Sequence, residues 1–173
     1  GLYGELKFMQ YVKNRKNIDI STSWHKSGPY SQYDFSNGQS SIEIKTTLSD
    51  NFTVTIKHQQ IFGDYPCTLV AINCEQYENG ETIEEVIEEM HSDHSAFNGI
   101  NFCINLAKEL KRVSIKDIKE KHFKVKLIQF FTAEDINPFP STPDAVSKLT
   151  YKLDLSEFDS LSESDSDLIL ETY

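Results

Sequence analysis

The residues with the clearest chemical potential lie between positions 33 and 47, in the segment YDFSNGQSSIEIKTT. An acid, an apolar residue and a lysine follow one another at Glu43, Ile44 and Lys45, and Asp34 precedes them. Carboxylate oxygens, with waters and phosphate oxygens, are the ligands that Mg²⁺ prefers. Bound Mg²⁺ lowers the pKa of a water molecule and neutralises phosphate charge, while a nearby lysine stabilises the transition state. These residue types therefore suit phosphodiester hydrolysis, with the Ile44 carbonyl as a candidate further metal ligand.

The acid-any-lysine pattern is a weak signal by itself, since composition alone predicts about two matches in a chain like this. This chain contains four matches, and three of them lie in segments whose apolar spacing predicts a helix. Only the match at 43–45 lies in an alternating strand pattern, with its middle residue facing a core. The matches are Glu5-Leu6-Lys7, Glu43-Ile44-Lys45, Glu109-Leu110-Lys111 and Asp117-Ile118-Lys119.

The Asn37-Gly38 pair predicts a tight hairpin, because both central positions of a type I′ turn need a positive φ, which Asn and Gly tolerate. With this pair as a two-residue turn, Asp34 lies opposite Ser41. Opposed residues share a face and side chains alternate, so Asp34, Glu43 and Lys45 point the same way. Asp34 and Glu43 are then diagonal neighbours, with Cα atoms about 7–8 Å apart. The register predicts that both carboxylates can share one cation; the alternative is an exposed cross-strand charge cluster.

Two further residues are candidates for the same site. Leu2 to Val12 has the apolar spacing of an amphipathic helix, and Glu5 falls on or beside its apolar stripe. A carboxylate facing a core is costly unless it is paired or bound to a metal, so we expect Glu5 to be a ligand. Its alternative role is a helix-start acid favoured by the helix dipole. Gln60, in a short helical turn, is a candidate for contacting a phosphate backbone or holding Lys45, or else is a surface residue.

The elements that must position these residues alternate between helix and strand. The periodicity predicts an α/β (α+β) fold, in which helices flank a central mixed sheet of about four to five strands. Residues 1–158 are expected to form one domain. Residues 159–173 form an acidic, Ser-rich tail, expected to be disordered or a partner-binding end. Beyond the hairpin, strands are expected at 52–56, 68–73, 124–132 and 149–155, and helices at 2–12, 58–61, 81–90 and 94–111, with an irregular approach at 21–31 and a loop around Pro138, Pro140 and Pro143.

The formal charge of −10 is unusual for a protein that binds nucleic acid, but the charges are unevenly distributed. Residues 75–93 carry eight acids and no Lys or Arg, and residues 153–173 carry seven acids and no base. Residues 108–126 contain eight bases. This basic stretch is either a nucleic-acid contact or a solvated surface.

The cysteines and the hydropathy indicate the compartment. The three cysteines are odd in number and show no CxxC pairing, which argues against a disulfide framework and a thiolate zinc site. No apolar run is long enough to cross a bilayer, and no charged-then-apolar leader opens the chain. We therefore expect a soluble protein in the cytoplasm, without membrane partners.

In their order along the chain, several segments resemble the bacterial PD-(D/E)XK motif proteins of restriction and phage-defence loci. The resemblance is good from Gly1 to about Ile61 and weaker afterwards, and it implies that the family has an N-terminal region that this stretch lacks. Tyr33 stands where the family name has proline, a common departure that does not threaten metal binding. The segments are GLYGEL, Trp24 before Gly28-Pro29, Asp34-Phe35, IEIKTT at 42–47 and Gln60-Ile61.

The resemblance implies a restriction-endonuclease-like core and a DNA endonuclease that depends on Mg²⁺, for which Mn²⁺ can substitute. By this resemblance Asp34, Glu43, Ile44 and Glu5 hold the metal, and Lys45 and Gln60 assist catalysis. The implied partners are DNA and either other subunits of a restriction-like system or a second copy of the chain. Two alternatives are a catalytically inactive module that binds a partner or DNA, and a nuclease that acts on RNA.

Overall fold

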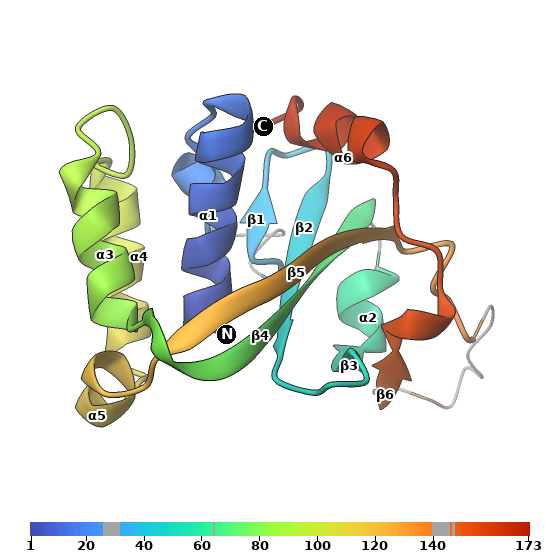
Figure 1. The fold of residues 1–173 in the computed structure, drawn as a ribbon. Coiled ribbons are helices and arrows are strands. Elements are labelled where there is room, and N and C mark those ends of the chain that lie inside the picture. Colours follow the sequence, from blue (N-terminus) through green and yellow to red (C-terminus); the bar gives the residue numbers. More distant parts are fainter. Residues whose placement is uncertain (26–31, 64, 140–145, 147) are drawn as a thin grey trace.

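The computed structural model describes residues 1–25, 32–63, 65–139, 146 and 148–173 (Figure 1). The predicted turn at Gly28-Pro29 and the prolines at 140 and 143 lie outside these residues. The helices are α1 (Leu2–Lys16), α2 (His58–Ile61), α3 (Ile83–Ser92), α4 (Ile100–Leu110), α5 (Ile115–Lys119) and α6 (Glu163–Leu170), with 3-10 turns η1 (Ile20–Ser23) and η3 (Leu155–Glu157). The strands are β1 (Phe35–Ser36), β2 (Ser41–Thr47), β3 (Thr53–Lys57), β4 (Cys67–Glu81), β5 (Phe123–Thr132) and β6 (Thr150–Asp154).

The central sheet has four strands in the order β1-β2-β4-β5. The β2 and β4 strands run parallel, whereas β1 pairs with β2 and β5 pairs with β4 in antiparallel fashion. The predicted mixed sheet is therefore confirmed. Strand β3 does not join it, but pairs with β6 in a second, two-stranded antiparallel sheet.

The two faces of the central sheet pack against different layers. Ile42 and Ile44 of β2 are buried in a cluster with apolar residues of α1, α3 and α4. Side chains on the opposite face of the sheet, such as Leu69 and Ala71 of β4, belong to a second cluster with apolar residues of β3, β6 and α2. Figure 1 shows α1, α3 and α4 on one side of the long β4 and β5 strands, with α2, β3 and β6 on the other. By strand alternation, Glu43 and Lys45 face the second layer.

The turn between β1 and β2 differs from the predicted two-residue type I′ turn. Of its residues only Gly38 has a positive φ, of 94°, whereas a type I′ turn needs two. The Asn37 side-chain oxygen instead accepts hydrogen bonds from the Gln39 and Ser40 amides, at 2.8 and 2.9 Å. This local bonding stabilises a longer loop.

The longer loop changes the strand register by two residues. Phe35 lies opposite Ile42, and continuing this register puts Asp34 level with Glu43, not with Ser41 as predicted. A shift of two leaves every side chain on its face, whereas a shift of one would reverse it. The predicted register was therefore wrong, but the face assigned to Asp34 was not affected.

The acidic end of the chain is ordered over α6. Leu170 is fully buried in the same cluster as α1. Arg15 Nε donates to Asp167 Oδ1 at 2.5 Å, and Lys16 Nζ lies 2.7 Å from Glu171 Oε1. Of the two expectations for this tail, disorder is thus wrong for residues 163–170, where Glu163 and Asp167 pair with Arg15 of α1.

Helix α1 is longer than the helix predicted at 2–12 and ends at Lys16. Asn17 caps it in the left-handed conformation, and its amide donates to the Lys13 carbonyl at 2.8 Å. Left-handed Asn is a common helix end. Within the described part of the chain, no helix has the length and apolar character needed to cross a membrane.

Candidate metal centre at the edge of β2

A glycine brings helix α1 close to strand β2. A Cβ atom added at Gly4 would lie 1.9 Å from Thr46 Oγ1, well inside van der Waals contact. Only glycine allows this approach without a shift of one element. The next residue of the helix, Glu5, is thereby placed at the outer edge of β2.

Glu5 is a buried carboxylate with two close partners. It is 8% exposed, and Trp24 Nε1 donates to its Oε2 at 2.8 Å. His25 Nε2 lies 3.0 Å from the same oxygen, an ion pair when the imidazole is protonated. Burial alone would raise the pKa of Glu5, but the close approach and charge of His25, together with the Trp24 bond, lower it overall. The same pairing raises the pKa of His25, although burial opposes this.

Asp34 takes the place of a strand partner for β2. Among the described residues, only Phe35–Ser36 of β1 pairs with β2 along its outer edge, and Ile44 lies beyond this pairing. There the Ile44 amide donates to Asp34 Oδ2 at 2.7 Å. Burial, followed by the charges of Glu43 and Glu5, raises the pKa of Asp34 well above its ordinary value. A cation between these carboxylates would reverse that penalty.

Glu43 is the most buried acid of the group, at 2% exposed. Its Oε1 pairs with Lys45 Nζ, but its Oε2 is buried without a hydrogen-bond partner. Burial raises the pKa of Glu43, and Lys45 only partly opposes the shift. An unpaired buried carboxylate oxygen is costly, and a metal ion is one of the partners that satisfies it.

Lys45 is held between the carboxylate of Glu43 and the side-chain amide of Gln60. Besides its contact with Glu43, its Nζ donates to Gln60 Oε1 at 3.4 Å. The Gln60 Nε2 in turn donates to the Gln32 carbonyl at 2.8 Å. Of the two roles considered for Gln60, holding Lys45 is the one that these contacts match.

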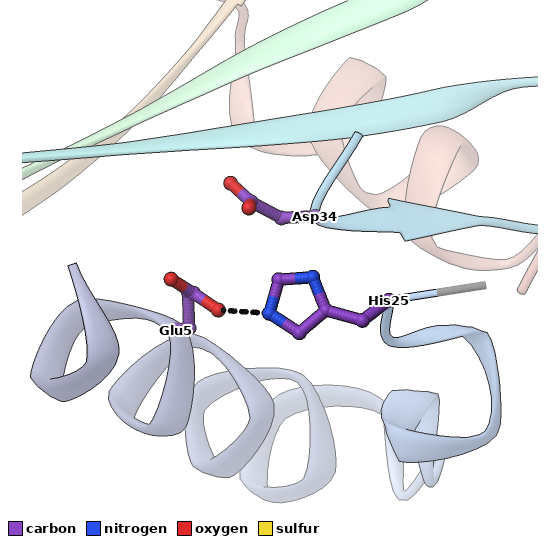
Figure 2. Close-up of side chains that lie close together, drawn as sticks. All are labelled: Glu5, His25 and Asp34. Atoms are coloured by element: carbon purple, nitrogen blue, oxygen red, sulfur yellow. Dashed lines mark ion pairs between the residues drawn. The ribbon is translucent and has the colours of Figure 1, made fainter. Parts of the chain in front are cut away.

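The structure groups the predicted residues together with one that the sequence did not suggest. Ligand atoms of Glu5, His25 and Asp34 all lie within 4.8 Å of one another (Figure 2). Glu43 is outside this group, although its charge acts on Asp34. The Ile44 carbonyl faces the same edge, because the N–H and C=O of one strand residue point to the same side. The predicted site residues therefore lie around β2, with Asp34 and the Ile44 backbone at its edge.

His25 is the residue that sequence reasoning missed. It lies after η1, outside every predicted helix and strand, so no periodicity related it to Glu5 or Asp34. The available signal was chemical: a histidine beside Trp24, within the segment that resembles the family, is a common metal ligand.

A hollow lined by cations adjoins the site. His25, Asp34 and Gln60 line one side of it, and Lys57, Arg112 and Lys148 also face it. A second hollow contains Lys45 and Lys152. These basic residues come from separate parts of the chain and gather beside the carboxylates, although the net charge of the chain is negative.

A comparison with family models finds one match, described as "Putative PD-(D/E)XK family member, (DUF4420)", over residues 1–156. Neither the curated proteins nor the solved structures give a significant match. The matched range includes every residue of the site described above and ends before α6.

Proposed function

The chain belongs to this PD-(D/E)XK family, and on that premise we propose that it is a Mg²⁺-dependent DNA endonuclease, for which Mn²⁺ can substitute. The observation that carries the proposal is the buried, unpaired Oε2 of Glu43 beside the crowded Asp34 and Glu5. This oxygen-rich donor set fits a hard divalent cation. When bound, such an ion supplies an activated water and offsets charge on the scissile phosphate.

Some of the protein residues would hold the cation, and others would act on the water and the phosphate. Asp34, Glu43, Glu5 and the Ile44 carbonyl would hold the cation at the edge of β2. Lys45, fixed by Glu43 and Gln60, would orient the attacking water and donate to the negatively charged phosphorane-like transition state. Its pairing fixes the ammonium group before substrate arrives, which reduces the reorganisation needed during the reaction.

The cation-lined hollow supports a nucleic acid as substrate. Lys57, Arg112 and Lys148 lie beside Asp34, within reach of phosphates that flank the scissile bond. Contacts of this kind position a phosphate backbone without reading its sequence. The acidic surfaces elsewhere would disfavour non-specific binding along the rest of the molecule.

The biological setting is part of the proposal. The resemblance to proteins of restriction and phage-defence loci supports a role as the cleavage component of such a system. One chain carries one site, whereas cutting both strands of a duplex needs two. We therefore infer that the chain acts with other subunits or as a homodimer, in the cytoplasm.

Cleavage assays with a matched pair of lysine variants test the proposal. The full chain is incubated with supercoiled plasmid, and with single- and double-stranded DNA and RNA, with Mg²⁺ or EDTA. We expect Mg²⁺-dependent nicking of DNA that Lys45→Ala reduces by about 10²–10³-fold. Lys119→Ala, which removes an exposed lysine of α5 that pairs with Glu84 of α3, should leave cleavage unchanged.

Three outcomes would contradict the proposal. Nicking that survives Lys45→Ala sinks the assigned mechanism. Cleavage restricted to RNA would identify the substrate as RNA. Absence of cleavage and of any metal-dependent change in melting temperature, also with partner subunits supplied, would favour a non-catalytic binding module.

A further inference from the structure

We propose that His25 is a ligand of the bound metal, and that the site therefore binds Mn²⁺ more tightly than Mg²⁺. This inference rests on the proposed function, because it concerns the same metal centre. The acid and lysine pattern of the family name contains no histidine. In the structure, however, the imidazole lies with Glu5 and Asp34 in the one group of metal-ligating side chains that the described residues contain.

The three side chains come from separate elements and converge. Glu5 projects from the first turn of α1, His25 follows η1, and Asp34 precedes β1. Figure 2 shows the imidazole pointing between the two carboxylates, with its near nitrogen toward Glu5. A mutual spacing within 4.8 Å suits ligands about 2.0–2.3 Å from a shared ion.

The His25 backbone is held in an unfavourable conformation. Its φ is 46°, in the left-handed region, where a non-glycine residue is strained. Its amide donates to the Asp34 carbonyl at 2.8 Å, and its ring lies 4.8 Å from that of Trp24. Strain of this kind persists only where surrounding contacts impose it, and it is concentrated at functional sites.

The Nε2 atom of His25 can bind an ion in place of a proton, because histidine binds metals in its neutral form. It is buried and, despite lying 3.0 Å from Glu5 Oε2, has no aligned hydrogen-bond partner. The Glu5 oxygen that it approaches already accepts the Trp24 indole bond. A second and independent sign of a cation site is Glu43, which is 2% exposed and whose Oε2 is buried and unpaired.

A nitrogen ligand changes which divalent ion the site prefers. Mg²⁺ binds oxygen ligands in a strict octahedral geometry and gives up its waters reluctantly. First-row transition ions accept imidazole together with carboxylates. An imidazole added to the carboxylates of this centre therefore favours a first-row transition ion such as Mn²⁺ over Mg²⁺, whereas carboxylates alone suit both ions.

The opposing explanation is that His25 only positions Glu5 through their ion pair. Cleavage activity cannot separate the ligand role from the positioning role, because both predict that a His25 variant cleaves more slowly. The nitrogen itself gives the deciding signal: pulsed EPR of Mn²⁺-loaded protein detects the coupling of a directly coordinated imidazole nitrogen to the metal.

The experiment uses the full chain without nucleic acid. Mn²⁺ and Mg²⁺ affinities are measured by calorimetry for the native chain, His25→Gln and His94→Gln, the last being an exposed histidine matched in substitution. We expect tighter binding of Mn²⁺ than of Mg²⁺, and a loss of Mn²⁺ affinity of about 10-fold or more in His25→Gln only. The pulsed EPR spectrum should show nitrogen coupling, which changes on labelling with ¹⁵N-histidine and disappears in His25→Gln.

The outcomes separate this inference from the proposed function. Mn²⁺ bound without nitrogen coupling, coupling that survives His25→Gln, or equal affinities for both ions would overturn the role of His25 and leave the nuclease proposal standing. If neither ion binds, both proposals fail. A circular-dichroism melt of each variant shows whether it is folded.

Discussion

The charged side chains at the two ends of helix α1 differ in how well they are paired with opposite charges. At its C-terminal end, Arg15 and Lys16 contact Asp167 at 2.5 and 3.1 Å, and their charges suit the helix dipole. The Arg15 hydrogen bond lowers the pKa of Asp167. At the N-terminal end, Glu5 joins Asp34, whose pKa is raised by burial and by neighbouring carboxylates.

The difference shows how similar side chains can serve stability or binding. In the contacts between α1 and α6, each acid meets a cation near the surface, and the pairing favours the folded state modestly. At the edge of β2, the buried Glu5 and Glu43 and the half-buried Asp34 share His25 and Lys45, so charge is left uncompensated. Perturbed acids of that kind are typical of sites that bind or react.

The sharpest way to break this comparison is to make the same substitution at both ends. In Asp34→Asn we expect DNA cleavage to fall about 10³-fold, the loss of several kcal/mol of transition-state stabilisation. The metal-free variant should nevertheless melt about 2 °C higher, because like-charge repulsion is relieved while the amide oxygen can still accept the Ile44 bond. Asp167→Asn should do the reverse, lowering the melting temperature and leaving cleavage unchanged.

Scanning calorimetry and the plasmid assay measure both properties. A lower melting temperature for Asp34→Asn would show that its carboxylate stabilises the fold, and the distinction between the two ends would be lost.

Gly4 tests whether close packing of α1 positions the acidic end. Gly4→Ala puts a Cβ 1.9 Å from Thr46 Oγ1, so α1 must move away from β2. We expect a destabilisation of about 1–3 kcal/mol, seen by urea unfolding, and reduced cleavage as Glu5 is displaced. The double variant Gly4→Ala/Thr46→Ala removes the clashing hydroxyl and should recover part of both losses. Equal cleavage in Gly4→Ala and the native chain would mean that Glu5 does not need this packing.

The end of α1 that contacts α6 gives a smaller, pH-dependent effect. Because the folded state lowers the pKa of Asp167, its stabilising contribution is present above the unfolded value of about 3.9 and is lost as pH falls through the folded value. The melting temperature of Asp167→Asn should therefore lie below that of the native chain by at most about 2 °C at pH 7, with the gap closing below about pH 4. Asp159→Asn, at an exposed acid, is the control. A gap as large at pH 3 as at pH 7 would contradict this origin.

Much of the fold follows from local pattern. The apolar alternation at 42–45 predicted β2, and the continuous apolar run at 68–73 predicted a central strand, which forms the buried part of β4. Boundaries were less predictable, because α1 is extended by contacts of Arg15 and Lys16 with α6, at the far end of the chain. The prediction of disorder for the tail failed for the same reason, because the composition of the tail does not show that its acids contact Arg15 and Lys16 of α1.

For the site, the sequence by itself determined which face of β2 carries Glu43 and Lys45, and put Asp34 on it. That result survived a wrong turn type because strand alternation has a period of two, and the register moved by two. The tertiary structure alone decided that His25 joins Glu5 and Asp34, and that Glu43 is left with an unpaired oxygen. These relations depend on how closely α1 packs against β2, a distance set by Gly4 and Thr46 from separate elements, which no local periodicity encodes.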